Sequence, residues 1–185
     1  MWYVSAVTSG PSSEPITLAK LKEHLKVETG DEDTLLDTYI TAARSYIESY
    51  CGTPLVSRSI TAKCDCFADF ANVPLVPLGG VSAVTYVDAA GAAQTLSTAV
   101  YEVRSDGLTA SIVLKYGQAW PSIQPGSRIS VAGTVGYSTV PEAIVAALLL
   151  LIAQWYANRE TSGEALSEAP HTVTALLVNH RNHSS

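Results

Sequence analysis

Residues 139–159 read TVPEAIVAALLLLIAQWYANR, and this stretch decides the fold. Thr139 and Glu142 have the Thr-x-x-Glu spacing of a capping box, with Pro141 in the first turn, so a helix is predicted over about 141–159. This helix is apolar nearly all the way round, through Ile144, Val145, Leu148, Leu149, Leu150, Leu151, Ile152, Trp155 and Tyr156. It must therefore be covered on several sides, and a neighbouring subunit could supply part of that cover.

Two more helices are predicted upstream of this one. The first covers about residues 17–26, because Thr17 can cap it and its apolar positions share one face, at Leu18, Leu21 and Leu25. The second covers about residues 33–51, where the apolar positions alternate steps of four and three, at Leu36, Ile40, Ala43, Ile47 and Tyr50. Gly52 and Pro54 then end it.

The segment between the second and third long helices, about 55–137, is typical of a β region. Val, Thr and Tyr are frequent, Gly and Pro separate short runs, and candidate strands lie at 59–66, 81–88, 95–103, 111–116 and 128–137. The predicted fold class is therefore α+β: mainly a helical bundle with an inserted antiparallel β-sheet region. Residues 1–160 are predicted to form a single domain, and 161–185 a polar linker with a short terminal helix.

The composition limits the function classes. The net charge is −6 and the 11 basic residues form no run, which argues against a protein that grips the phosphate backbone of DNA. Only 15% of the residues are charged, against roughly 25% in an average soluble protein, as expected of a protein that associates with itself. The longest strongly apolar run, 143–153, has 11 residues, whereas a membrane span needs about 20, so no membrane partner is expected.

The sequence shows no catalytic constellation, and neither an enzyme activity nor a cofactor is predicted. Cys64-x-Cys66 could contribute two zinc ligands, but a structural site needs four at a recognisable spacing. The histidines at 171, 180 and 183 have no His-Glu-x-x-His pattern. Asp31, Glu32 and Asp33 suit the positive end of the following helix better than a calcium loop. A small metal-binding domain or hydrolase stays open as a minor alternative.

Two segments together resemble a known family. The first is EPITLAKLKEHLKV at 14–27, followed by 33–52 with its AARSYIE core at 42–48. The second is VGYSTVPEAI at 135–144, continuing to QWYANRE at 154–160. Shorter matches lie at 86–88 (YVD), 101–103 (YEV), 120–121 (WP) and 176–181 (LLVNHR), while 64–70 matches no family motif. In this order the segments resemble the head–tail connector (adaptor, or head-completion) proteins of long-tailed bacteriophages and prophages.

The resemblance implies a structural subunit of the phage neck, assembled in the bacterial host cytoplasm and located in the virion. Subunits of this family would form a homo-oligomeric ring that joins the portal of the DNA-filled head to the downstream neck or stopper protein. The ring would extend the channel, and DNA would pass through without specific binding, as a net negative charge favours. A different tail-completion or neck ring protein is the alternative within the same class.

The resemblance also indicates where contacts would lie. We expect the C-terminal docking segment, 161–185, to meet the portal through Leu176, Leu177 and Arg181, although the two leucines could instead pack on the protein's own core. Arg44 and Arg159 are candidates for ion pairs between subunits, with solvated helix faces as the alternative.

Overall fold

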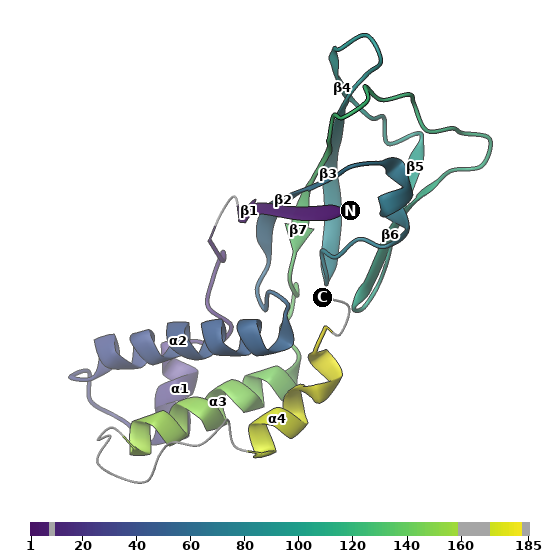
Figure 1. Cartoon of the computed structure of the whole chain (residues 1–185). Helices are drawn as coiled ribbons and strands as arrows, with labels where there is room; N and C mark the ends of the chain where they lie inside the picture. Colours follow the sequence, from purple (N-terminus) through teal and green to yellow (C-terminus); the bar gives the residue numbers. More distant parts are fainter. Residues whose placement is uncertain (8–9, 159–170, 183–185) are drawn as a thin grey trace. The chain divides into compact units, whose positions relative to one another are not determined.

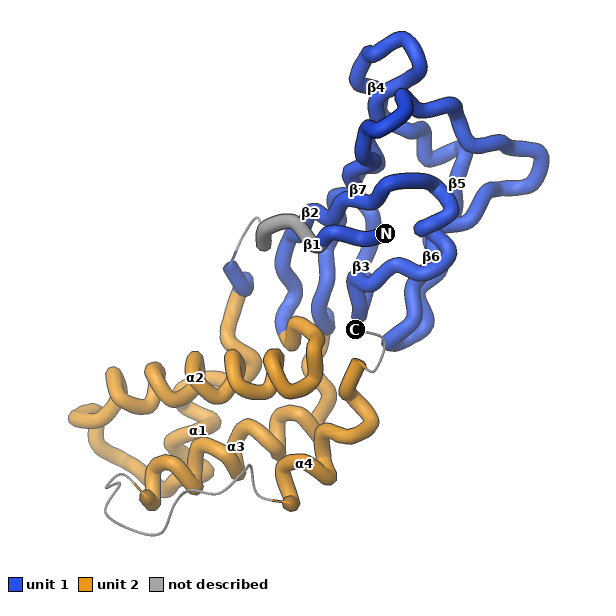
Figure 2. Tube along the Cα trace, viewed as in Figure 1, with its two compact units in different colours: residues 1–12, 56–138, 184–185 blue, residues 13–55, 139–183 orange. Residues whose placement is uncertain are grey.

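The computed structural model describes residues 1–7, 10–158 and 171–182, and Figure 1 shows its elements. The chain forms two compact units, coloured separately in Figure 2. The described part of the sheet unit lies in residues 1–12 and 56–138. That of the helical unit lies in residues 13–55 and 139–182, so the sheet unit interrupts the helical unit in the sequence.

The helical unit consists of α1 (Leu18–Leu25), α2 (Asp33–Cys51), α3 (Glu142–Ala157) and α4 (His171–Leu177), followed by the 3-10 helix η2 (Val178–His180). Helix α3 packs against each of the other three α-helices. Its side chains meet theirs in a core of Leu21, Leu36, Ile40, Ala43, Ile47, Ile144, Leu148, Ile152, Val173 and Leu177. Each buried Leu or Ile side chain contributes about 1.5–3 kcal/mol, so the cover of α3 is the main stabilising feature of this unit.

The ends of these helices follow local chemistry, with one correction. Thr17 Oγ1 accepts a hydrogen bond from Lys20 N (3.2 Å) at the start of α1, and Gly52 ends α2 in the left-handed conformation at φ 65°. The predicted capping box at the start of α3 is wrong. Pro141 is itself the N-cap, and the amides of Ile144 and Val145 close the first turn onto its carbonyl at 2.9 and 3.1 Å. Glu142 is then the first helical residue and cannot reach back as a capping box requires.

The sheet unit contains a five-stranded antiparallel sheet in the order β1-β2-β7-β3-β4 and a two-stranded sheet, β5-β6. The strands are β1 (Trp2–Val7), β2 (Arg58–Cys64), β3 (Leu78–Val87), β4 (Ala93–Thr95), β5 (Tyr101–Asp106), β6 (Thr109–Leu114) and β7 (Ile129–Val135). The mixed α+β class is thus confirmed. The expected predominance of the helical bundle is not, because the strands build a compact unit with its own core.

Two features of the strands differ from the prediction. The strand expected at 95–103 is interrupted by a turn, in which the amides of Ala99 and Val100 bond to the side chain and carbonyl of Ser97 at 3.2 and 3.0 Å. Its two ends fall in β4 and β5, which belong to different sheets. Strand β1, which pairs with β2 at the sheet edge, was not predicted.

An aromatic cluster occupies the core of the sheet unit. It centres on the 3-10 helix η1 (Phe67–Ala71), within the stretch that matched no family motif. Phe67 stacks on Trp120 at 4.7 Å between ring centroids, and Phe70 contacts both Trp120 (5.4 Å) and Trp2 (5.9 Å). Trp2 Nε1 also donates a hydrogen bond to Asp69 O (2.9 Å). The cluster thereby links β1, η1 and the long loop before β7.

We predict that Phe70→Ala lowers the free energy of unfolding by about 3–5 kcal/mol, because it leaves a cavity among three aromatic rings. Urea titration followed by near-UV circular dichroism measures this change. Tyr116→Ala is the matched control in the same unit, since Tyr116 is fully exposed and its loss is expected to cost less than about 0.5 kcal/mol. Equal effects of the two substitutions would show that the cluster does not stabilise the unit.

Candidate assembly surfaces

The net charge of the chain lies in one of its two units. Residues 1–12 and 56–138, the sheet unit, carry five acidic and five basic side chains. Residues 13–55 and 139–183, the helical unit, carry twelve acidic and six basic side chains, so they hold the whole net charge of −6. Any surface through which this protein associates must therefore avoid setting one acidic helical unit against another.

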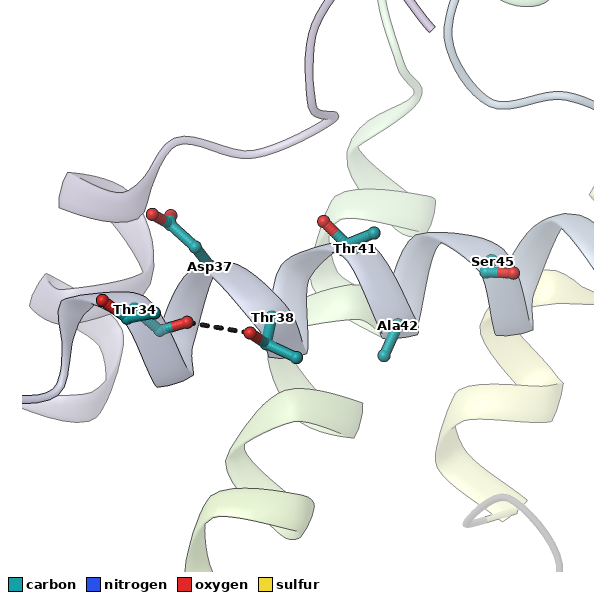
Figure 3. A pocket seen from close by; sticks show the side chains of 6 residues that line it. All are labelled: Thr34, Asp37, Thr38, Thr41, Ala42 and Ser45. Atoms are coloured by element: carbon teal, nitrogen blue, oxygen red, sulfur yellow. Dashed lines mark hydrogen bonds between the residues drawn. The ribbon is translucent and has the colours of Figure 1, made fainter. Parts of the chain in front are cut away.

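The solvent-facing side of α2 carries mainly small, uncharged side chains. Opposite the buried stripe of this helix lies a shallow hollow of about 480 Å³, shown in Figure 3 and lined by Thr34, Asp37, Thr38, Thr41, Ala42 and Ser45. Thr38 Oγ1 donates a hydrogen bond to Thr34 O at 2.9 Å, so this hydroxyl is turned back onto the helix. We call these six residues the outer α2 face. Asp37 is its only charged member, whereas the exposed face of a helix in water usually carries many charges.

An aromatic edge borders this face. Tyr39 and Tyr46 of α2 each contact Trp155 of α3 edge to face, with ring centroids 6.3 Å apart in both pairs. Leu35 and Tyr46 are exposed, although both have large and mainly apolar side chains. Exposed aromatic groups beside a small-residue surface are common where proteins associate.

Arg44, a predicted interface residue, is engaged within its own helical unit. Its Nε lies 2.8 Å from Glu14 Oε2 and its Nη1 lies 3.3 Å from Glu48 Oε2, and its side chain is only 12% exposed. Burial opposes the charge of Arg44, but the hydrogen bonds and charges of Glu14 and Glu48 outweigh it, so the pKa of Arg44 is raised. Arg159, the other predicted interface residue, lies outside the described residues.

The described part of the C-terminal segment, residues 171–182, packs within the helical unit. Val173 and Leu177 are buried there, Leu177 with 1% exposure, while Leu176 is half-buried and Arg181 is exposed. Leu177 is one of the three residues predicted to meet the portal. In the structure it packs on the protein's own core, which was the alternative prediction. Val178, which the sequence analysis did not single out, is 54% exposed. Nothing in the residue types distinguishes Leu177 from Val178, since only packing decides which is covered.

Two contacts fasten the end of this segment to α2. Asn182 N donates a hydrogen bond to Cys51 O at 2.7 Å, and the Arg181 guanidinium lies 5.2 Å from the centre of the Tyr50 ring. Cys51 is fully buried. Burial raises the pKa of its thiol to about 11, although the charge of Arg181 partly opposes the shift. The reactivity of the Cys51 thiol can therefore be used to detect whether residues 171–182 are packed on α2.

One side of the five-stranded sheet holds Ile60, Ala62, Cys64, Ile129, Val131 and Val135, all buried. The other side is partly exposed and shows three cross-strand rows: Tyr3, Lys63, Ser130 and Thr85; then Thr61, Ala132 and Ala83; then Ser59, Thr134 and Gly80. We call these ten residues the open sheet face. Apart from Tyr3 and Lys63 its side chains are small and uncharged.

Of the residues considered for metal binding, His183 lies outside the described part of the chain, and the others form no metal site. Cys64 is buried, with a pKa raised to about 12 chiefly by burial, and Cys66 is exposed. Among residues 1–7, 10–158 and 171–182 no group of three or more His, Cys, Asp or Glu side chains could hold a metal ion. In the same part of the chain no helix is long and apolar enough to cross a membrane.

Comparisons with known proteins point to one kind of assembly. Residues 15–103, just under half of the chain, match the family model described as phage gp6-like head-tail connector protein. A search of curated proteins finds no match.

Solved structures extend the likeness to nearly the whole chain. They include the virion of a native gene transfer agent (GTA) particle (TM-score 0.72), the neck of an empty GTA particle computed with C6 symmetry (0.71) and the neck of a native GTA particle computed with C12 symmetry (0.67). Each matched chain is 26% identical, and each match covers 98% of this chain and 95% of the other.

These matches support the resemblance predicted from the sequence: residues 15–103 match the phage head-tail connector model, and nearly the whole chain is similar to chains of gene transfer agent particles. Its particular likeness is to the chains of gene transfer agent necks. The family and the matched structures are structural components of particles and not enzymes.

We predict that Arg44→Ala lowers the free energy of unfolding by about 1–3 kcal/mol, because it leaves the partly buried Glu48 carboxylate without this partner. Lys20→Ala is the control, since the ion pair of Lys20 with Glu142 is exposed and 4.0 Å long, and it should change stability by less than about 0.5 kcal/mol. Chemical denaturation of both variants measures the difference. If Arg44→Ala left the free energy of unfolding unchanged, the two ion pairs of Arg44 would contribute nothing to stability.

We also predict that Leu177→Ala makes Cys51 roughly tenfold or more reactive toward iodoacetamide, because the loss of a buried leucine favours local opening of the segment over α2. Labelling of each cysteine is followed by mass spectrometry, with the exposed Cys66 as the internal reference. Val178→Ala, an exposed change in the same segment, should leave Cys51 protected. Continued protection of Cys51 in Leu177→Ala would show that this side chain does not hold the segment.

Proposed function

We propose that this protein is a structural subunit of a phage-type neck that assembles into a homo-oligomeric ring between the portal and the tail-side neck proteins. The observation that carries the proposal is the match over 98% of the chain to proteins of gene transfer agent necks, with TM-scores of 0.71 and 0.67. The C6 and C12 symmetries of those necks support a ring for the present chain as well. Such a subunit would act in the virion neck after assembly in the host cytoplasm.

The surface chemistry supports this proposal. A ring uses two different patches on each subunit, and the chain offers two faces of mainly small side chains on separate units: the outer α2 face, with one acidic residue, and the open sheet face, with one basic residue. The ring would extend the channel for the genome. Because the helical unit carries the net charge of −6, DNA would pass it without being held.

In this proposal residues 1–160 form the connector domain, and 161–185 link it to the portal. Leu176 and Arg181 are accessible in the isolated chain and can make first contact. Leu177 would reach the portal only if the segment left its place on α2, where the side chain is 1% exposed. Arg44 would enter a subunit contact together with Glu14, and Arg159 is proposed to contribute an intersubunit ion pair.

A subunit of a different ring in the same neck is the second candidate. Two of the matched structures are necks with no particular layer of the neck specified, and this observation keeps the second candidate open. Binding to the portal separates the two functions, because a downstream ring would bind a connector and not the portal itself.

The test is co-sedimentation of the purified protein with assembled portal protein from the same phage or prophage, with ring formation followed by native mass spectrometry. We expect stoichiometric binding that Leu176→Asp with Arg181→Glu reduces by about tenfold or more. Thr172→Ala, an exposed change in the same helix, should bind like the wild type. A protein that neither forms rings nor binds portal would contradict the connector function, and rings that ignore the portal would favour another layer.

A further inference from the structure

The open sheet face presents one charge that has no partner. At one end of this face Arg128 Nε lies 3.5 Å from Asp65 Oδ1, with the guanidinium 3.9 Å from the centre of the Tyr3 ring, so these groups satisfy one another. Lys63, in the same row as Tyr3, has no ion-pair partner among the described residues and is exposed. An antiparallel sheet that faces water on one side usually alternates core residues with larger polar ones. Here Ser, Thr, Ala and Gly dominate, so a second backbone can approach closely.

The outer α2 face has the complementary features. Its one charged residue, Asp37, is exposed and has no ion-pair partner in the part of the chain that the structure describes. The remaining side chains of the face are small, and the hollow of about 480 Å³ leaves room for side chains of another surface.

We propose that the open sheet face of one copy packs on the outer α2 face of the next copy, with Lys63 opposite Asp37. The inference rests on the proposed ring and names the two patches that build it. The sizes agree: the α2 face from Thr34 to Ser45 is about 16 Å long at 1.5 Å per residue. Four strands span about 14 Å at 4.8 Å between neighbours.

Charge disfavours the two symmetric arrangements of these patches. Two α2 faces placed together would bring one acidic helical unit against another and would offer Asp37 no opposite charge. Two sheet faces would offer Lys63 no opposite charge. Either pairing would also close as a dimer, whereas packing one patch on the other continues from copy to copy until a ring closes. The contact of a neutral sheet unit with an acidic helical unit avoids the repulsion and lets Lys63 face Asp37.

The experiment uses charge reversal on the full chain, with ring formation measured by native mass spectrometry and negative-stain microscopy. Lys63→Glu or Asp37→Lys alone should raise the protein concentration needed for assembly by about tenfold or more, since like charges then face each other. The double variant should assemble again. An equimolar mixture of the two single variants should also assemble, as rings in which the variants alternate, because each contact then joins opposite charges.

Matched controls separate this inference from a general effect of charge. Arg104→Glu on the sheet unit and Glu23→Lys on the helical unit change the net charge equally at exposed positions outside the two faces, and should assemble like the wild type. Circular dichroism confirms that each variant is folded. If both single variants assembled into rings like the wild type, or if their mixture failed to assemble, the proposed contact would be overturned while the ring function would stand. Absence of rings from the wild type, with and without portal, would overturn both.

Discussion

The helical unit depends on the burial of α3, a helix with almost no polar side. An apolar helix of this kind needs cover on several sides, and α1, α2 and α4 supply it for one part of its surface, whereas Leu150 remains exposed. Two of these helices precede strands β2 to β7 in the sequence and one follows α3, so all four helices are present only after these strands have been made. The short α4 is therefore part of the fold, because it buries Val173 and Leu177 in this core.

This arrangement separates stability from association. Most apolar side chains are used inside each unit, and the surfaces left over include an acidic helical unit and two faces of small side chains, on α2 and on the sheet, that carry few charges. Small faces lose little side-chain entropy when they are covered. A subunit of the proposed ring, which would contact copies of itself and let DNA pass, would benefit from these properties.

Local signals in the sequence predicted part of this structure. Thr17 caps α1 and Gly52 ends α2 because these features depend on a few neighbouring residues. The capping box predicted at Thr139 was wrong because Pro141 starts the helix itself, and the strand predicted at 95–103 was wrong because Ser97 turns the chain.

The aromatic cluster joins Trp2, Phe67, Phe70 and Trp120, and contacts between residues so far apart in the sequence leave no periodic pattern. The candidate sites could not be predicted for the same reason. Arg44 pairs with Glu14, which is 30 positions away in the sequence, and the residues of the open sheet face become neighbours only when the strands pair in their register.

This chain is proposed to build a ring on a portal. Cryo-electron microscopy of the purified protein mixed with assembled portal tests it most directly. The account predicts a closed ring of this chain, coaxial with the portal channel, with density for the C-terminal segment against the portal. Isolated copies bound at the portal rim, or a portal without added density, would contradict it.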